Sequence, residues 1–266
     1  GRKQEFCLES LNLAEILQYR GINLKNPIQN SFGLIEEILE EYLLFGGYPE
    51  IVMAGSHEQK RKKLLEIAES YILRDIKELF DIKNTDNLQL VSSFIAENIG
   101  NLLSKDNISN LAAVSKYEIE KCLDSLQKTF VICLIKPFAK NVTKELIHRP
   151  KMYFYDLGIR NAILRKLEPH MIIADKGKLF ENAIEIQLSS IFPRRSIGFW
   201  RTINKTEVDF VVRDQDGFLD VFETKYSWES PGLPRNLGSF IATYKDLIKS
   251  AQVISKENFW RIFQKR

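Results

Sequence analysis

Apolar residues recur at helical spacing through the first third of the chain. In residues 31–45 they fall three or four positions apart, which places them on one face of a helix. The sequence Gly46-Gly-Tyr-Pro49 follows, and because glycine and proline break helices, we expect the helix to end there. The same periodicity predicts a second helix over about residues 58–80. Near the beginning of the chain, Asn12 and Glu15 have the spacing of a capping box at a helix start.

The next segment predicts the order of elements found in a winged helix. Three helices, a strand and a wing are expected at residues 88–103, 108–114, 116–128, 130–135 and 137–147. In DNA-binding modules of this kind the last helix enters the major groove. Here that helix carries Lys116 and Lys121, but its acidic residues leave it nearly neutral, which weakens phosphate binding. Contact with DNA and a packing or partner-docking role therefore both stay open.

Past residue 149, short apolar strands alternate with helices. The segment Lys151-Met-Tyr-Phe-Tyr-Asp156 predicts a buried strand, and Asp156 is expected to cap the helix that follows. A longer helix over residues 177–191 carries Glu181. Towards the end of the chain we expect a helix over residues 239–250 and a short strand over residues 252–255. The order of elements predicts an α+β or α/β protein, helical at first and richer in strands later.

A β-hairpin is predicted between these last helices. Two apolar runs, residues 208–212 and 218–222, flank a polar stretch that ends in Asp216-Gly217, a pair typical of tight turns. Asp209 lies in the first run, and Glu223 and Lys225 close the second. Because side chains two apart in a strand share a face, we expect Glu223 and Lys225 to lie side by side, with Asp209 next to them.

Composition sets limits on the class of protein. The chain has 266 residues, of which 44% are hydrophobic and 27% charged, as in ordinary soluble proteins. It has no apolar run long enough for a membrane span, so a cytoplasmic location without membrane contact is expected. Its three cysteines and three histidines are scattered, which argues against a zinc site and against disulfides. The sequence begins Gly1-Arg2 without a methionine, and we expect a fragment of a longer protein.

Charge is distributed unevenly along the chain. Residues 1–148 contain 18 Lys and Arg against 21 Asp and Glu, whereas residues 149–266 contain 20 against 14. The basic excess therefore lies in the half that carries the hairpin. Such an excess suits a polyanionic substrate.

The side chains of the hairpin suit metal-assisted hydrolysis of phosphodiesters. Mg²⁺ or Mn²⁺ is held by a few carboxylates, water and phosphate oxygens, and Asp209 and Glu223 are candidate ligands. A bound cation lowers the pKa of its water and neutralises charge at phosphorus, while Lys225 is placed to orient the water. The alternative is an exposed ion pair between Glu223 and Lys225, contributing less than about 1 kcal/mol to stability.

Asp209 followed by Glu223-Thr-Lys225 resembles the signature of the restriction-endonuclease-like, or PD-(D/E)xK, superfamily. A glutamate on a preceding helix often completes that signature, and Glu181 matches its place. Val208 stands where the signature often has proline. The resemblance implies a restriction-endonuclease-like α/β domain with a mixed central sheet, catalytic Asp209, Glu223 and Lys225, and a metal held by Glu181, Asp209 and Glu223. Arg201 is a candidate phosphate contact, with an interior ion pair as its equal rival.

Six ordered blocks extend the resemblance over nearly the whole chain. They read GGYPEIV (46–52), SYILRDI (70–76), KMYFYDLGIRNAI (151–163), GKLFENAIEIQL (177–188), FWRT to EVDFVV (199–212) and FETKYS (222–227). Together they are similar to the DUF4143 region of predicted prokaryotic AAA-type ATPases. The resemblance implies an ATPase tail at residues 1–30, a helical linker at 31–85, a winged-helix domain at 86–148 and a nuclease-like domain at 149–266.

The resemblance also implies a partner, an N-terminal ATPase module of the same protein. This chain contains no phosphate-binding loop of the form G-x-x-x-x-G-K-[ST], so no nucleotide site is expected in it. Our main hypothesis is a Mg²⁺- or Mn²⁺-dependent nuclease-like module acting on nucleic acid, with DNA favoured. The alternative is a catalytically silent module that binds DNA or protein and regulates the ATPase. A sequence-specific transcription regulator is the least favoured reading.

Overall fold

A computed structural model describes residues 9–23, 31–80, 84–138, 149–230 and 232–265. Its helical N-terminal part begins as the sequence predicts. Asn12 and Glu15 form the capping box of the first helix, because each side chain accepts a hydrogen bond from the other residue's backbone N–H. The predicted second long helix is also present, although its middle turns, Ala68–Asp75, are π-helical. The helices of this part are α1 (Leu13–Tyr19), α2 (Phe32–Phe45), α3 (Pro49–Val52), α4 (His57–Ile67) and α5 (Ile76–Leu79).

The three helices of the predicted winged-helix segment pack on one another, followed by a strand. They are α6 (Thr85–Glu97), α7 (Lys105–Ala112), α8 (Lys116–Lys128) and β1 (Ile132–Ile135). The first helix ends six residues earlier than predicted, because Gly100 adopts a φ of +73° and its N–H bonds to the Met152 carbonyl. Most of the predicted wing, residues 139–147, lies outside the described residues. The winged-helix assignment stays a prediction.

Strand β1 pairs antiparallel with β2 (Lys151–Phe154), whose buried character confirms the predicted strand. The two strands stand on either side of the boundary that the domain division sets at residue 149, and that division stays a prediction. Asp156 then caps α10 (Leu157–Ile163), as expected. A 3-10 helix (Pro169–Asp175) leads into α11 (Lys176–Ile191), the long helix that carries Glu181.

The C-terminal part is built on a mixed four-stranded sheet. Its order is β3-β4-β5-β6, antiparallel between the first three strands and parallel between β5 and β6. The strands are β3 (Ile197–Arg201), β4 (Glu207–Arg213), β5 (Leu219–Thr224) and β6 (Ile248–Ile254), and α12 (Arg235–Tyr244) precedes the last. A 3-10 helix, Phe259–Lys265, follows the sheet. The chain is thus an α+β protein, helical first and sheet-containing later.

The predicted hairpin is confirmed, a neighbouring strand was missed, and the end of the helix after the hairpin is corrected. The side chain of Asp214 accepts the N–H groups of Asp216 and Phe218, and Gly217 has a φ of +90°, which favours glycine. Strand β3 was not predicted as a strand. The helix predicted to reach residue 250 ends at Tyr244, because the chain turns and enters β6 at Ile248 to pair with β5.

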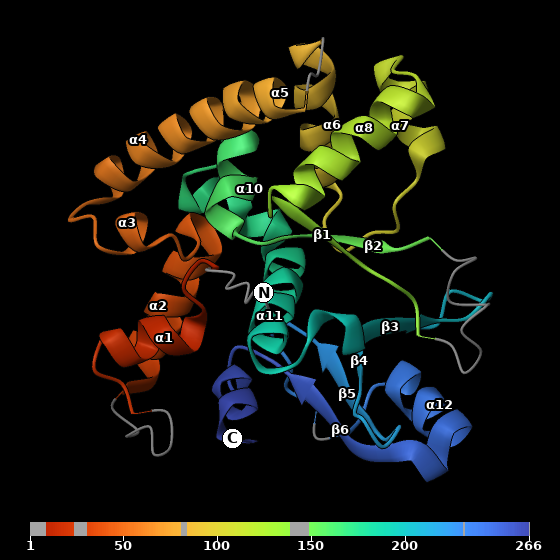
Figure 1. The fold of residues 1–266 in the computed structure, drawn as a ribbon. Helices are drawn as coiled ribbons and strands as arrows, with labels where there is room; N and C mark the ends of the chain where they lie inside the picture. The colour runs from red at the N-terminus through yellow and green to blue at the C-terminus, as the bar shows by residue number, and fades with distance from the viewer. Residues whose placement is uncertain (1–8, 24–30, 81–83, 139–148, 231, 266) are drawn as a thin grey trace, which may run out of the picture.

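Two apolar cores cover the two faces of the sheet. The larger core joins the N-terminal helices, β1, β2 and α11 to one face, where Phe210 and Phe222 contribute. The smaller core lies under α12 on the other face and includes Val211, Val221 and Phe240. Figure 1 shows α11 between the helical part and the sheet. Within the described residues, no helix is long and apolar enough to cross a membrane.

The end of α2 crosses the start of α10 at very close range. Asp156 Oδ2 accepts the N–H of Gly47 at 2.8 Å, and Oδ1 accepts the N–H of Ile159 at 3.0 Å. A Cβ atom added to Gly158 would lie 2.1 Å from the Phe45 carbonyl oxygen. The two backbones therefore meet at a distance that only glycine allows. Burial raises the pKa of Asp156 to about 6, although the backbone hydrogen bonds oppose that rise.

Substituting two helix glycines by alanine tests this close approach of the backbones. Gly158→Ala is expected to lower the free energy of unfolding by about 1–3 kcal/mol, because the new methyl group overlaps the Phe45 carbonyl. Gly238→Ala, in α12 with open space around it, is the matched control and is expected to gain about 0.5–1 kcal/mol. Urea unfolding followed by circular dichroism measures both. Equal effects of the two substitutions would contradict the crossing described here.

Asp156 predicts a pH dependence of stability. Its folded-state pKa of about 6 exceeds the ordinary value of 3.8, so the folded protein binds more protons between these limits. The stability that Asp156 contributes is therefore largest near pH 4 and declines as the pH rises through 6. Relative to Asp156→Asn, the wild-type protein is expected to gain stability as the pH falls from 7 to 4.5. A constant difference between the two proteins in urea unfolding at both pH values would refute this.

Candidate functional site

Strand β4 contains a β-bulge at the centre of the candidate site. The register with β3 shifts by one residue there, so that Asp209 and Phe210 together oppose Phe199. Phe210 packs in the larger core, whereas Val208 and Val211 both belong to the smaller core under α12. Regular alternation would place Asp209 on the same face as Val211. The bulge instead turns Asp209 toward α11 and β2.

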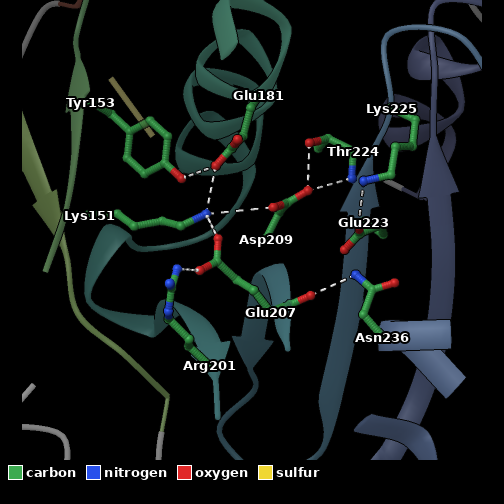
Figure 2. A network of polar contacts seen from close by, with 10 residues as sticks. All are labelled: Lys151, Tyr153, Glu181, Arg201, Glu207, Asp209, Glu223, Thr224, Lys225 and Asn236. Carbon is green, nitrogen blue, oxygen red and sulfur yellow. Dashed lines mark hydrogen bonds and ion pairs between the residues drawn. The ribbon is translucent and has the colours of Figure 1, made fainter. Parts of the chain in front are cut away.

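Thr224 fixes the carboxylate of Asp209. Oδ2 of Asp209 accepts the backbone N–H of Thr224 at 2.8 Å and its hydroxyl at 2.7 Å. Both donors come from the last residue of β5, so the side chain of Asp209 joins the ends of β4 and β5 (Figure 2). The other oxygen, Oδ1, lies 3.6 Å from the ammonium nitrogen of Lys151. Asp209 is therefore held firmly through one oxygen and only loosely through the other.

Lys151 projects from β2 into a cluster of three carboxylates. Its Nζ lies 2.8 Å from Glu181 Oε1, 2.6 Å from Glu207 Oε1 and 3.6 Å from Asp209 Oδ1. Only 1% of the residue is exposed. Burial disfavours the charged ammonium, but the three acidic neighbours outweigh burial and raise the pKa of Lys151. The lysine therefore stays charged inside the protein, and Figure 2 shows it at the centre of the contacts.

Glu181 reaches this cluster from the second turn of α11. Its Oε1 accepts hydrogen bonds from Lys151 at 2.8 Å and from the hydroxyl of Tyr153 at 2.5 Å. A Cβ atom at Gly100 would lie 3.2 Å from the other oxygen, so the turn after α6 covers the carboxyl group. Burial raises the pKa of Glu181 to about 7, an effect that Lys151 opposes and Asp209 adds to. Glu181 is thus protonated more readily than an exposed glutamate.

Glu223 and Lys225 lie on the other side of Asp209. Glu223 shares the strand face of Val221, which packs under α12, whereas Thr224 points to Asp209. Lys225 Nζ donates to Glu223 Oε1 at 2.7 Å. The second oxygen of Glu223, Oε2, is buried and accepts no hydrogen bond within the described part of the chain. The side chain of Asn236 nevertheless lies near enough to Glu223 to help lower its pKa.

The pKa values of this pair follow from their surroundings. Burial and the charge of Asp209 raise the pKa of Glu223, although Lys225 opposes the rise. Burial disfavours the charged form of Lys225, but its hydrogen bond to Glu223 and the charges of Glu223 and Asp209 outweigh burial and raise the pKa. The side chain of Lys225 is 42% exposed, so it lies where the cluster meets solvent.

The structure places four predicted site residues close enough to influence one another's charge, although strand alternation puts Glu223 on the face opposite to Asp209. Glu181, Asp209, Glu223 and Lys225 come from α11, β4 and the end of β5, and each influences the charge state of another. Their catalytic and metal-binding roles stay predictions. Arg201, the candidate phosphate contact, is exposed and forms an ion pair with Glu207, whereas the alternative that the sequence left open was an interior ion pair.

The two predicted DNA-binding lysines lie elsewhere. Lys116 and Lys121 belong to α8, which stands on the far side of β1 and β2 from the sheet in Figure 1. Lys116 pairs with Asp106 at 2.7 Å. A role for these lysines in DNA binding stays a prediction.

Sequence reasoning missed three members of the cluster, Lys151, Tyr153 and Glu207. A signal for each was present. Lys151 and Tyr153 are polar residues two apart in a strand whose other residues predict complete burial. Glu207 stands two positions before Asp209 in the predicted hairpin strand. Polar side chains on one face of a buried strand need partners, and these partners are the carboxylates of the site.

The donors of the cluster have the chemistry of a site for a hard divalent cation. Carboxylate oxygens are the ligands that Mg²⁺ and Mn²⁺ prefer, and Glu223 Oε2 and Asp209 Oδ1 keep lone pairs for one. In the described residues no group of three or more His, Cys, Asp or Glu is arranged as a ready metal site. The ammonium of Lys151 occupies the position among Glu181, Glu207 and Asp209 where a metal ion bound by these three carboxylates would lie. The chemistry of the donors suits a cation, Asp209 and Glu223 are the least committed carboxylates, and metal binding stays a prediction.

Comparison with known protein families gives two matches, one over most of the helical part and one over the C-terminal part. Residues 36–170, more than half of the chain, match the family model described as "Domain of unknown function (DUF8612)". The chain belongs to the DUF8612 family. In this DUF8612 protein, residues 176–262 match a second model, "Domain of unknown function (DUF4143)". The predicted DUF4143 region is thus confirmed, but over α11 and the sheet and not over nearly the whole chain.

A longer archaeal protein is similar to this DUF8612 protein. "Uncharacterized protein MJ1544" of Methanocaldococcus jannaschii is 23% identical over 258 residues. The match covers 93% of this chain and 55% of the archaeal protein, so the chain spans about half the length of that relative. No solved structure matches.

Lys151 yields a stability prediction. Lys151→Met leaves Glu181, Glu207 and Asp209 without their shared cation, and removing one partner of a buried ionic cluster costs about 3–5 kcal/mol of unfolding free energy. Combining it with Glu181→Gln is expected to recover part of the loss. Lys128→Met, which breaks the exposed pair with Asp124, is the control and should cost less than about 1 kcal/mol. If both lysine substitutions have equal effects in urea unfolding, Lys151 does not hold the cluster.

Proposed function

We propose that Asp209, Glu223 and Lys225, supported by Glu181, form a Mg²⁺- or Mn²⁺-dependent site for phosphodiester hydrolysis. The domain that carries it would be restriction-endonuclease-like, and its substrate a nucleic acid, with DNA favoured. One observation carries the proposal. Four residues selected from the sequence for this chemistry gather at one end of the hairpin, with a buried, unpaired oxygen on Glu223.

Each side chain has a role in the proposed reaction. Asp209 and Glu223 would hold the cation, and Glu181 would support it from α11. When bound, the cation lowers the pKa of a coordinated water and neutralises charge developing on the phosphate. Thr224 keeps Asp209 in place through two hydrogen bonds, so little side-chain order has to be gained on binding. Lys225, charged and partly exposed, would orient the water or stabilise the developing negative charge.

The charge balance of the cluster supports a cation there. Four carboxylates, Glu181, Glu207, Asp209 and Glu223, face only three cationic side chains, those of Lys151, Arg201 and Lys225. With every carboxyl group ionised, the cluster keeps an excess negative charge. The raised pKa values of Glu181 and Glu223 come mainly from burial, and the charge of Asp209 adds to both as part of that excess. A divalent cation would relieve it without a proton.

The proposal includes a larger context. By resemblance, the domain would act together with an AAA-type ATPase module of the same protein, and α6–α8 with β1 would form a winged helix. Lys116 and Lys121 are the residues of that unit proposed to contact DNA, although Lys116 is paired with Asp106. The similar archaeal protein is nearly twice as long as the matched region, which leaves room in that protein for a further module.

A second candidate is a catalytically silent module that binds DNA or protein and regulates the ATPase. The buried ammonium of Lys151 favours it, because this lysine already neutralises the carboxylates that a metal would use. In that case the cluster would join β2, α11 and β4 as a structural unit, and Glu223 with Lys225 would be a partly exposed ion pair.

Nuclease assays separate the two candidates. Plasmid, linear duplex and single-stranded DNA would be incubated with the protein and Mg²⁺ or Mn²⁺. Asp209→Asn and Lys225→Met are each expected to lower cleavage by about 100-fold or more, because each removes a group acting on the transition state. Asp216→Asn, at an exposed position of the hairpin turn, is the matched control and should cleave like the wild type.

Circular dichroism would show that each variant is folded. A folded wild-type protein that neither cleaves DNA nor binds Mn²⁺, as measured by calorimetry, would end the nuclease proposal and favour the silent module.

A further inference from the structure

A second feature of the sheet lies at the opposite end of β4. A groove of about 550 Å³ opens between the segment after β1, the turn after α11 and the ends of β3 and β4. The groove is distinct from the Asp209 cluster, because none of its lining residues belongs to that cluster. Three cationic side chains line it, those of Lys136, Arg195 and Arg213, and one carboxylate, that of Asp214.

Two of the three groove cations lack the ion pairs that most lysines and arginines form in the described part of the chain. Within the described part of the chain, neither Lys136 nor Arg195 forms an ion pair or a side-chain hydrogen bond, and both are exposed. The one acidic group, Asp214, already contacts Lys249 at 3.4 Å and accepts two backbone N–H groups of the turn. As far as the described residues go, the groove therefore has an excess of positive charge, which favours a polyanion.

The backbone around the groove holds these cations in place. Residues 136–138 run beside β3, where the Phe138 N–H bonds to the Phe199 carbonyl and the Phe199 N–H to the Lys136 carbonyl. The guanidinium of Arg213 lies 4.7 Å from the centre of the Phe138 ring, and stacking of this kind orients a guanidinium. An oriented guanidinium binds phosphate oxygens through two parallel hydrogen bonds.

The geometry points to a binding site for the phosphate backbone of a nucleic acid strand in this groove, and Lys136, Arg195 and Arg213 are the residues that we propose to hold it. The choice of nucleic acid over an acidic protein segment rests on the proposed function of the Asp209 cluster. Asp209 and Arg213 are four residues apart in β4, and because the bulge adds one residue without lengthening the strand, the rise is about 10 Å. Phosphates along one strand of a duplex advance about 3.4 Å per nucleotide. The groove would thus hold the substrate about three nucleotides from the bond that is cut.

Binding without metal tests the groove separately from cleavage. Fluorescein-labelled 20-nucleotide single-stranded DNA and the matching duplex would be titrated by anisotropy in EDTA, at several salt concentrations. The double variant Lys136→Gln/Arg195→Gln is expected to bind single-stranded DNA at least tenfold more weakly than the wild type. Its log–log salt slope should be smaller by about 1.4, the loss expected for two phosphate contacts on a single strand.

A matched double variant controls for the loss of net charge. Lys62→Gln/Arg261→Gln removes two exposed cations from α4 and from the C-terminal 3-10 helix, and should bind like the wild type. A 20-residue polyglutamate should compete poorly with the DNA. Three results would each overturn the inference: a wild-type protein that binds no DNA, a groove variant that binds as the wild type does, or polyglutamate that displaces the DNA as well as unlabelled DNA does.

Cleavage by the same variants tells the two proposals apart. If DNA binding depends on the groove but no DNA is cut with Mg²⁺ or Mn²⁺, the groove stands and the nuclease proposal fails. If the wild type cuts DNA and the groove variant binds and cuts equally well, the nuclease proposal stands and the groove is refuted.

Discussion

The buried ammonium of Lys151 is the interaction on which the arrangement of this protein depends. It lies on β2, in the helical part, and its partners lie on α11 and β4. Taking one charge out of water is costly, and the cost is recovered only if opposite charges and hydrogen bonds surround it closely. β2, α11 and β4 must therefore approach one another within hydrogen-bonding distance. The chemistry of the site and the joining of the two parts of the chain rely on the same atoms.

Several sequence blocks that suggest a functional family have structural explanations. Gly46-Gly-Tyr-Pro49 and Asp156-Leu-Gly158 lie at the crossing of α2 and α10, where a carboxylate and two glycines let two backbones meet. Asn182 exchanges two hydrogen bonds with the backbone of Phe154, which ties α11 to β2. Residues of this kind position the site without contributing to its chemistry. Among the six blocks, those around Glu181, Asp209 and Glu223 hold the side chains that could take part in the proposed reaction.

Much of the fold follows from local patterns in the sequence. The capping box at Asn12, the cap at Asp156 and the turn at Gly217 depend on residues close in sequence, and all three were predictable. The placement of Lys151 was not. Lysine is a surface residue by default, and its burial depends on acidic groups more than 25 residues away in the sequence.

Predictability within the candidate site divides in the same way. The proximity of Glu223 to Lys225 follows from the period of a strand, and the hairpin brings Asp209 near. The face on which Asp209 lies does not follow from that period, because it depends on the register against β3, a strand that the sequence did not reveal. The helix end misplaced in α6 has a similar cause, a contact between Gly100 and β2 that no local pattern records.

The bulge in β4 bears on how this site is to be found in distant relatives. One extra residue in a strand shifts the alternation of its side chains. The apolar positions before Asp209 and those after Phe210 therefore do not follow a single alternating pattern. Substitution can erase the letters of a short motif, and here a valine already precedes the aspartate. A break in alternation is harder to lose, because deleting one residue would carry every side chain beyond it to the opposite face of the sheet. The break in alternation thus marks the position of the site even where the motif has diverged.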